Sequence, residues 1–326
     1  MDLNPKLVTV FGGSGFVGTQ IVQLLARRGY RVRVGVRRPD LAGHLKPLGS
    51  VGQIVPVQAN VRNMASIERA VAGADMVINL VGVRFERAKQ TFDAVHVEGA
   101  GNIARAAAAA GAKALVHMSA LGIEGAETSR YGQSKLAGEA EVFKAFASAV
   151  VIRPSLIFGP GDSFFNLMGS LSRYFPVMPL IGGKSRFQPA YVGDVAQAFA
   201  MAADGEVRAG RIYEIGGPDI LTHRELLERI LAETGRARPL LPLSRGVAKL
   251  IALPFTILPF PPLLTGDLVE TLSYDNVVSE AAIKEKRTLA AFGIKPTGMG
   301  TVLPSYLWRF RKHGQFDRHD HAPRVA

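Results

Sequence analysis

The first half of the chain alternates short runs of β-branched and aliphatic residues with longer stretches in which apolar residues recur every three or four positions. This alternation predicts parallel strands, because consecutive parallel strands must be joined by crossovers, which helices normally supply. The predicted strands are Leu7–Phe11, Arg31–Val36, Ile54–Gln58, Met76–Val81, Ala114–Met118 and Val150–Arg153. The predicted helices between them are Gly15–Arg28, Met64–Ala72, Phe92–Ala110 and Tyr131–Phe146. The pattern therefore predicts an α/β fold with a doubly wound parallel sheet.

After Pro154 the alternation becomes less regular. We expect a large α/β domain over residues 1–160 and a smaller, irregular region over residues 161–326 that partly returns to the sheet. This second region contains a proline-rich apolar stretch at 250–264 and a basic tail at 308–326, which we expect to be loosely held. Its predicted elements are helices at Phe164–Arg173, Gly193–Ala203 and His223–Thr234, the last with the capping-box pair Thr222 and Glu225, and a strand at Tyr213–Ile215.

The composition excludes several classes of site. The chain has 326 residues, of which 48% are hydrophobic and 20% charged, which excludes a disordered, coiled-coil or collagen-like chain. It has no cysteine, so disulfides, thiolate metal sites, iron–sulfur clusters and cysteine nucleophiles are excluded. The formal net charge of +12 indicates an anionic partner: a phosphate-rich ligand, nucleic acid, a membrane face or an acidic protein.

No secretory signal or membrane-spanning segment is expected. Met1 is followed almost directly by an apolar strand, without the longer apolar run of a signal peptide. The longest uncharged apolar run, residues 250–264, is shorter than the roughly 20 residues that a spanning helix needs, and it contains four prolines. We interpret this stretch either as an exposed apolar surface, beside which Arg245 and Lys249 suit anionic lipid headgroups, or as a buried loop over a substrate pocket.

A glycine-rich loop follows the first predicted strand and opens the first predicted helix. The glycines at 12, 15 and 18 have the spacing at which a tight turn lets the backbone approach a pyrophosphate, and the helix then offers N–H donors. The surrounding strand–helix alternation is the context that this motif requires. The loop residues that we expect to contact a dinucleotide are Gly12, Gly13, Ser14, Gly15, Phe16, Val17 and Gly18.

The end of the second predicted strand favours NADP(H) over NAD(H). Sheets that bind NAD usually place an acidic residue there, on the adenosine ribose. This chain has Arg37 and Arg38, whose guanidinium groups can pair with a 2′-phosphate. The nearest acid is Asp40, and we expect Pro39 to turn it out of reach. The alternative is a solvated pair of surface arginines.

Three further side chains predict a catalytic group beside the nicotinamide. Ser119 ends the fifth predicted strand, and Tyr131 and Lys135 lie four apart at the start of the next helix, on one face. The lysine ammonium is expected to lower the pKa of the phenol, so that the tyrosine exchanges a proton near neutral pH while the serine holds the substrate oxygen. The lone histidines His96 and His117 are interpreted as core or helix residues rather than catalysts.

Several motifs together resemble the extended and atypical short-chain dehydrogenase/reductase superfamily over about residues 6–235. They are the glycine loop, Asn79–Gly82, Ser119, Tyr131–Lys135, Arg153–Asp162 and Tyr191–Ala196. The resemblance implies a nucleotide-binding role for residues beyond the loop, and it makes the domain over residues 1–160 an NADP(H)-binding Rossmann domain. Those further residues are Asn60, Val61, Leu80, Val81, Gly82, Pro154, Ser155 and Ile157, in addition to Ser119, Tyr131 and Lys135. Where many members carry an acid near the adenine, this chain has Asn60, which can hydrogen-bond the adenine.

Within the superfamily, the chain resembles the alpha-subcomplex accessory subunit nine family of respiratory complex I, in a bacterial version. The resembling stretches are His117–Gly122, Ile152–Ser155, Asp267–Leu272 and Asp275–Val278. The resemblance implies a tightly bound NADPH that is held structurally, without turnover. It implies a peripheral position on the cytoplasmic face of the bacterial inner membrane, beside the core hydrophilic-arm subunits near the quinone site. Residues 245–264 would then contact the membrane surface or anionic lipid.

Two other functions stay open at this point. One is an active NADP-dependent reductase, or a sugar-nucleotide-type epimerase or dehydratase, that uses Ser119, Tyr131 and Lys135; the other is a redox sensor whose nucleotide state sets partner binding. No nucleic-acid partner is expected, because the basic tail carries no recognisable recognition motif. No metal is expected either, since His313, His319 and His321 lie in the loosely held tail, with no ordering acids other than Asp317 and Asp320.

Overall fold

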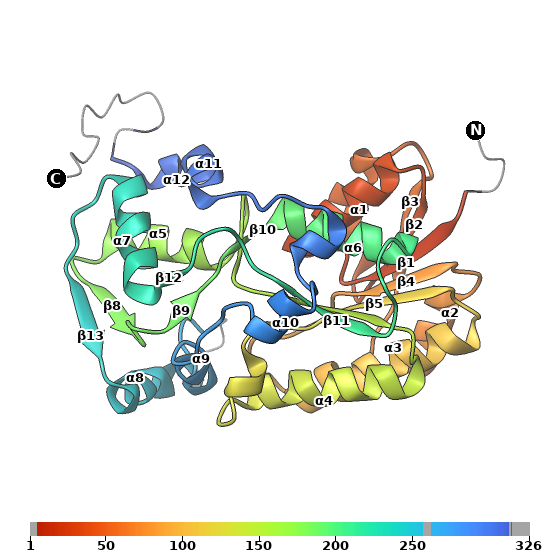
Figure 1. The fold of residues 1–326 in the computed structure, drawn as a ribbon, viewed down its shortest axis with the longest axis horizontal. Helices are drawn as coiled ribbons and strands as arrows, with labels where there is room; N and C mark the ends of the chain where they lie inside the picture. The colour runs from red at the N-terminus through yellow and green to blue at the C-terminus, as the bar shows by residue number, and fades with distance from the viewer. Residues whose placement is uncertain (1–4, 257–261, 313, 315–326) are drawn as a thin grey trace.

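The computed structural model describes residues 5–256, 262–312 and 314. Its centre is a seven-stranded sheet in the order β11-β6-β5-β4-β1-β2-β3, in which every neighbouring pair is parallel (Figure 1). The strands are β1 (Leu7–Phe11), β2 (Arg31–Val36), β3 (Ile54–Gln58), β4 (Met76–Asn79), β5 (Ala114–Met118), β6 (Val150–Pro154) and β11 (Arg211–Ile215). The predicted doubly wound parallel sheet is confirmed. The strand order reverses between β1 and β4, which is where such sheets bind their ligands.

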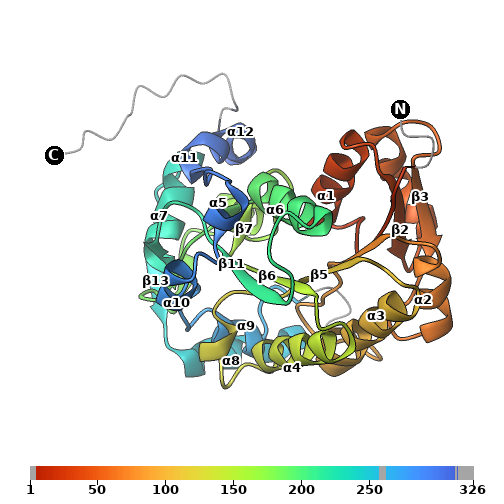
Figure 2. The same cartoon turned by 45° about the vertical axis from the view of Figure 1, so that its right-hand side comes forward.

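Helices cover both faces of the sheet (Figures 1 and 2). On one face lie α1 (Phe16–Arg27) and α6 (Val192–Asp204); on the other lie α2 (Met64–Val71), α3 (Glu98–Ala109) and α4 (Arg130–Ala145). The predicted helices are thus present, with shifted ends. The expected helix over Phe92–Ala110 begins with a π-helical turn, η2 (Asp93–Val97), before α3 starts. A Cβ atom on Gly138 of α4 would lie 2.1 Å from the carbonyl oxygen of His96, so α4 touches this turn backbone to backbone.

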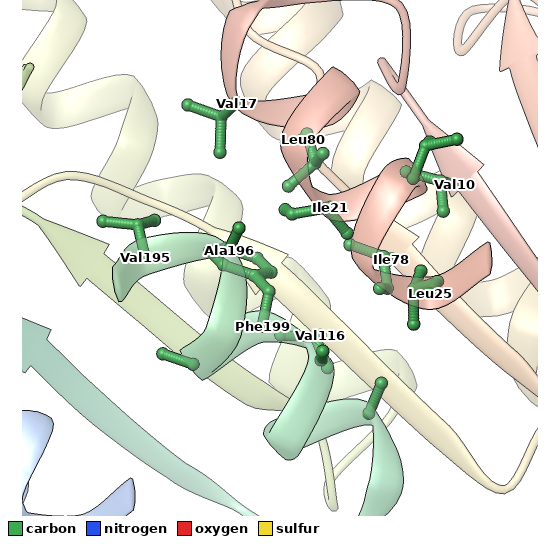
Figure 3. Close-up of a cluster of buried hydrophobic side chains, with 14 of the residues drawn as sticks. Val10, Val17, Ile21, Leu25, Ile78, Leu80, Val116, Val195, Ala196 and Phe199 are labelled. Carbon is green, nitrogen blue, oxygen red and sulfur yellow. The ribbon is translucent and has the colours of Figure 1, made fainter. Parts of the chain in front are cut away.

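The larger core lies between the sheet, α1 and α6 (Figure 3). Strand residues alternate between faces, so Val10 of β1 and Ile78 of β4 meet Ile21 of α1 on this side. Phe199 of α6 is fully buried in the same cluster. Small residues make up much of the buried face of α6, which lets this helix pack closely on the strands. A second core fills the space between the sheet and α2, α3 and α4.

The second half of the chain adds α6 and β11 to the central layers and builds a third core of its own. Its strands form three two-stranded sheets: β7 (Ile157–Phe158) with β10 (Ala190–Tyr191), β8 (Met178–Ile181) with β13 (Leu240–Leu243), and β9 (Arg186–Phe187) with β12 (Leu221–Thr222). Its predicted helices are present as α5 (Phe164–Tyr174), α6 and α7 (His223–Thr234), and the predicted capping box of α7 is confirmed. The remaining elements are η1 (Pro39–Leu48), η3 (Ile123–Gly125), α8 (Arg245–Ala252), η4 (Leu253–Thr256), α9 (Gly266–Thr271), α10 (Glu280–Lys284), η5 (Leu289–Phe292), α11 (Met299–Val302), α12 (Pro304–Leu307) and η6 (Trp308–Phe310).

The apolar stretch at 250–264 begins on the surface. Leu250 of α8 is 66% exposed, whereas its neighbour Ala248 is buried beneath the helix. Residues 257–261 of this stretch lie outside the described residues. Among the residues that the structure describes, no helix is long and apolar enough to cross a membrane.

The start of the basic tail is packed rather than loosely held, which corrects the expectation from sequence. Phe310 lies against the third core, where a Cβ atom on Gly169 would come within 2.6 Å of its ring. Arg311 donates to the carbonyl oxygen of Glu233, 2.8 Å away. His313 and residues 315–326 lie outside the described residues, and with them the expected absence of a metal site at His313, His319 and His321.

Candidate functional site

The glycine loop shapes the turn between β1 and α1. Gly12 has φ +77, a left-handed conformation that favours glycine. A Cβ atom on Gly18 would lie 2.5 Å from the carbonyl oxygen of Gly12, so α1 packs directly on the turn. No side chain caps the first turn of α1, and no acidic residue lies there. The N-terminus of α1 therefore points free backbone donors and the positive end of its dipole toward an anion at this edge.

The loop after β4 lies beside the glycine turn. A Cβ atom on Gly12 would come within 3.2 Å of the carbonyl carbon of Leu80 and 3.3 Å of the Val81 nitrogen. The structure thus brings the predicted residues Leu80, Val81 and Gly82 to the point where the strand order reverses. This is the position at which the nicotinamide half of a dinucleotide meets the sheet in doubly wound folds.

The two arginines after β2 have different environments. The Arg37 guanidinium donates to the side-chain oxygen of Gln90, a neutral partner. The Arg38 guanidinium pairs with Asp40 at 2.9 Å, and both groups are mostly exposed. Pro39 therefore does not turn Asp40 out of reach, contrary to the expectation from sequence. This ion pair lowers the pKa of Asp40 and raises that of Arg38. Within the part of the chain that the structure describes, Arg37 has no acidic partner.

A basic loop that the sequence analysis missed lies across the same end of the sheet. Residues 84–90 follow β4, and Gln90 from this loop holds Arg37. Arg62, after β3, donates to the carbonyl oxygen of Lys89 at 2.9 Å. The loop thereby brings the Lys89 backbone and the Gln90 side chain to the expected adenosine site, whereas Arg84 of the same loop acts on Tyr131, whose pKa it lowers in part. The run of basic residues was visible in the sequence, but its position over β2 and β3 depends on contacts between distant residues.

Asn60 is placed near the adenosine end as expected, but one of its side-chain atoms is already used. Its Oδ1 accepts from the backbone N–H of Arg62 at 3.1 Å, which stabilises the turn after β3. The backbone N–H of Asn60 donates to Ser66 Oγ at 2.9 Å. The amide nitrogen of the Asn60 side chain is thus the atom left to meet an adenine acceptor.

Ser119 and Lys135 are brought together at the carboxyl end of β5. Ser119 is 3% exposed, and its Oγ has no hydrogen-bond partner within the described part of the chain. Lys135 is also buried, and its Nζ donates to the carbonyl oxygen of Met118 at 3.2 Å. A Cβ atom on Gly82 would lie 3.3 Å from this Nζ, so the lysine also contacts the loop after β4. These residues fit a nicotinamide dinucleotide, because a buried hydroxyl without a partner is normally satisfied by a ligand or by water.

Tyr131 packs differently from the expected catalytic arrangement. Its ring makes edge contacts with Phe92 and His96, with centroids 5.9 and 5.4 Å away. Its backbone N–H, in the first turn of α4, lies 3.3 Å from both carboxylate oxygens of Asp267. Burial raises the pKa of the Tyr131 phenol to about 12; the Arg84 guanidinium lowers it only in part, and the Asp267 carboxylate raises it further.

The expected lowering of the Tyr131 pKa by Lys135 is therefore wrong for this structure. Burial removes the phenolate from water, and that desolvation outweighs the attraction of nearby cations. Burial also lowers the pKa of Lys135 to about 8, although the Glu139 carboxylate opposes this shift. A lysine that is partly neutral near pH 8 stabilises a phenolate less than a fully charged one.

The residues after β6 reach the same edge, and the C-terminal segment covers them. The Ser155 hydroxyl donates to the carbonyl oxygen of Asn276 at 2.9 Å, and the Leu156 N–H donates to Asn276 Oδ1 at 3.0 Å. The Ser155 hydroxyl is thus used by the chain itself, and its role in binding the nucleotide stays a prediction. Asn276 belongs to a stretch that carried the family resemblance, but no local pattern predicted its contact with β6.

Comparison with known proteins identifies the family. The model of the NAD dependent epimerase/dehydratase family matches residues 8–216. The chain belongs to this family. It is 35% identical over 291 residues to NADH dehydrogenase [ubiquinone] 1 alpha subcomplex subunit 9, mitochondrial, of Arabidopsis thaliana, covering 85% of this chain and 72% of that protein. It is 33% identical over 190 residues to the ceramide reductase of Caulobacter vibrioides, covering 58% of each protein.

Solved structures confirm the fold. The crystal structure of gox2253 superposes with a TM-score of 0.71 at 20% identity, covering 96% of this chain and all of that one. At this identity the likeness concerns the fold alone. The epimerase/dehydratase family model supports nicotinamide dinucleotide binding.

Proposed function

We propose that this chain is an accessory subunit of bacterial respiratory complex I that binds NADPH and holds it without turnover. The cations at the end of β2 carry the nucleotide part of this proposal. Arg37 stands where NAD-binding sheets place an acid, it has a neutral side-chain partner, and Arg62 and the basic loop at 84–90 lie next to it. A 2′-phosphate would gain charge-assisted hydrogen bonds at this position, whereas the 2′-hydroxyl of NADH would not.

The nucleotide preference is tested with Arg37→Ala. Loss of one charge-assisted contact is expected to weaken NADPH binding about 10- to 100-fold, while NADH binding changes little. Isothermal titration calorimetry with both nucleotides measures this difference, and Arg105→Ala, an exposed arginine on α3, is the matched control. An equal loss for NADPH and NADH would refute the assignment of Arg37 to the 2′-phosphate.

Membership of complex I is supported by the relatives named as subunit 9, which share 35% identity over 85% of this chain in the plant case. The proposal places the chain on the cytoplasmic face of the inner membrane, beside the core hydrophilic-arm subunits near the quinone site. The test is to tag the chain at its native locus and separate detergent-solubilised membranes on a native gel. We expect it in the complex I band, with core subunits identified by mass spectrometry; recovery only as a free, unassociated chain would refute the proposal.

The environment of Tyr131 supports holding over turnover. A bound NADPH supplies a hydride, and a reductase must then deliver a proton from a group that titrates near the working pH. Here burial raises the pKa of Tyr131 to about 12, and its ring packs against Phe92 and His96. Asp267 binds the backbone of the same turn and thereby ties the C-terminal segment to the start of α4.

An active NADP-dependent reductase is the second candidate. It is favoured by Ser119, whose buried Oγ has no partner among the described residues, and by the likeness to a ceramide reductase. In that case Tyr131 donates the proton and Ser119 holds the carbonyl oxygen. Tyr131→Phe separates the candidates: we expect unchanged assembly of complex I and unchanged NADPH binding. Loss of a measurable NADPH-dependent reductase activity on exchange of this one hydroxyl would favour the second candidate instead.

The exposed face of α8 supports a contact with anionic lipid. Val247, Leu250 and Ile251 are each 44 to 66% exposed, and Leu253 continues the patch. Arg245 and Lys249 lie on the same helix, although Lys249 pairs with Glu270 of α9. An apolar face flanked by cations suits the headgroup region of an anionic bilayer.

Vesicle binding tests this surface. Leu250→Ser is expected to weaken co-sedimentation with phosphatidylglycerol-containing vesicles about tenfold, because one buried leucine contributes about 1.5 kcal/mol or more. Leu41→Ser on η1 is the matched control, since Leu41 is 63% exposed on a different part of the surface. Equal binding of the wild type to neutral and to anionic vesicles would contradict the role of the cations. Equal losses of vesicle binding in Leu250→Ser and Leu41→Ser would contradict the assignment of the lipid contact to α8.

A further inference from the structure

Two buried histidines contact the loop at residues 79–83, which begins with the last residue of β4: His117 contacts Asn79, and His96 contacts Val83. This loop touches the glycine turn at Gly12 and the Lys135 side chain of α4, so its shape sets one wall of the expected dinucleotide site. Both histidines are 2% exposed. His96 has entered so far only as a packing partner of the Tyr131 ring, and His117 has not entered the proposed function at all.

His117 acts on the loop through Asn79. The backbone N–H of Val81 donates to Asn79 Oδ1 at 3.0 Å, which fixes the orientation of that side-chain amide. The other amide atom, Nδ2, is therefore a donor, and it lies 3.0 Å from His117 Nδ1. His117 Nδ1 must accept this bond, so its proton is on Nε2, a buried atom without a partner in the described structure.

His96 acts on the loop directly. The backbone N–H of Val83 donates to His96 Nε2 at 2.9 Å, so this nitrogen is an acceptor and the proton is on Nδ1. Nδ1 then donates to Ser134 Oγ at 2.8 Å, and that hydroxyl donates to the carbonyl oxygen of Tyr131 at 2.8 Å. The ring is stacked on Phe92, and its tautomer is set by partners on both sides. His96 thus connects the loop after β4 to the helix that carries Lys135.

We infer that His96 and His117 are positioning residues for the nucleotide, holding opposite neutral tautomers so that the loop at 79–83 keeps the shape that receives the nicotinamide half. The inference rests on the proposed binding of NADPH. Burial, together with the nearby Lys135 charge, lowers the pKa of each ring to about 3, which agrees with two neutral rings. Gly138 supports the arrangement, because α4 can touch the π-helical turn that carries His96 only without a side chain there.

The tautomers are tested directly by NMR. The full chain is labelled with ¹⁵N-histidine, and long-range proton–nitrogen correlations are recorded at pH 7 with assignment by single substitution. We expect His96 to carry its proton on Nδ1 and His117 to carry its proton on Nε2. The same tautomer at both positions, or a protonated ring at either, overturns the inference.

The positioning role is tested with matched and mismatched amides. His96→Gln and His117→Asn place an amide oxygen close to the accepting nitrogen of each ring, whereas His96→Asn and His117→Gln place it at the wrong distance. All four keep a polar side chain. The ligands are NADPH and 2′,5′-ADP, which has the adenosine half with its phosphates but no nicotinamide.

We expect the mismatched variants to bind NADPH about tenfold more weakly, the effect of about one lost hydrogen bond, and to bind 2′,5′-ADP like the wild type. The matched variants are expected to bind NADPH within about threefold of the wild type. His223→Gln, at a buried histidine that contacts Ile181 in the C-terminal region, is the control and should not change the ratio of the two affinities.

Two outcomes overturn the inference: equal losses for both ligands, which indicate a purely structural role, and NADPH affinities that do not differ between matched and mismatched amides. Binding of both ligands to the wild type is measured first. If the wild type binds neither ligand, or binds 2′,5′-ADP but not NADPH, the proposed function is contradicted instead. The two failures are therefore distinguishable.

Discussion

The two neutral histidines make the stability of the fold depend on pH in a way that can be calculated. Each ring has a pKa of about 3 in the folded chain and an ordinary value of 6.5 when exposed. Below pH 6.5 the unfolded chain therefore binds protons that the folded chain does not, so the free energy of unfolding falls as the pH falls. The stabilisation from each neutral ring is fully present above pH 6.5 and is lost progressively down to about pH 3.

The size of the effect follows from the same two values. Between pH 7 and pH 5, the change in the free energy of unfolding is about 2 kcal/mol for each histidine, or about 4 kcal/mol for His96 and His117 together. A typical domain has a stability of about 5 to 15 kcal/mol, so this loss is a large fraction of the total. The buried carboxyls of Asp162 and Asp194, whose pKa values are raised by burial, act in the opposite direction.

The assay is urea unfolding at pH 5, 6 and 7, followed by circular dichroism, for the wild type and for the His96→Gln/His117→Asn double variant. The variant lacks the two titrating rings. Between pH 7 and pH 5, the fall in its free energy of unfolding should therefore be about 4 kcal/mol smaller than the fall for the wild type. Contributions from all other groups are common to both proteins and cancel in the difference. Parallel stability curves for the two proteins would refute the reasoning, because they would mean that neither ring has a lowered pKa in the fold.

Two further substitutions test the packing around the same helix. Gly138→Ala places a Cβ atom 2.1 Å from the carbonyl oxygen of His96, so we expect α4 to shift and the free energy of unfolding to fall by about 1 to 3 kcal/mol, measured by urea unfolding; an unchanged value would contradict the backbone contact. Glu139→Gln removes the buried carboxylate that binds the Arg153 guanidinium through both oxygens at 2.8 and 2.7 Å, while the exposed Glu124 keeps its contact with Arg153 at 2.7 Å. We therefore expect the free energy of unfolding to fall by about 1.5 to 3 kcal/mol, less than for a buried ion left without any partner. Glu141→Gln, on the exposed side of α4, is the control and should change it by less than about 1 kcal/mol.

Much of the sheet follows from local sequence patterns. The strands β1, β2, β3 and β5 have the predicted bounds, because each is a short run of mostly apolar residues. Burial on both faces was not needed for this, since β3 at the edge of the sheet is buried only at Ile54. The capping box at Thr222 and Glu225 was also predictable, since it depends on residues three positions apart. Helix ends were less certain, and the π-helical turn before α3 was not predicted, because it accompanies a contact with α4 about forty residues later along the chain.

The site was predictable as a set of residue types but not as a geometry. The glycine spacing, the arginines after β2 and the Ser119–Tyr131–Lys135 set all came from the sequence, and the structure brings them to one edge of the sheet. Three facts could not be predicted: the ion pair of Arg38 with Asp40, the loop at 84–90 over the adenosine end, and the burial that raises the Tyr131 pKa. The last two depend on residues brought together by tertiary packing, which no short motif specifies. The ion pair is local, but it depends on the backbone conformation around Pro39, which the residue types alone do not specify.

The C-terminal segment connects the nucleotide site to the exposed surface of α8. Asp267 of α9 binds the first turn of α4, and Glu270 on the same helix accepts from Thr128 at 2.7 Å. Glu270 also pairs with Lys249 of α8, so one short helix contacts both the start of the Tyr131 helix and the proposed lipid-binding helix. Because one short helix makes both sets of charged contacts, a change on the α4 side or the α8 side that moves α9 must also alter the contacts on the opposite side. An NADPH-dependent change in vesicle affinity, abolished by Asp267→Asn, is the expected consequence of this connection, and a vesicle affinity that is independent of the nucleotide would show that α9 holds both sites without coupling them.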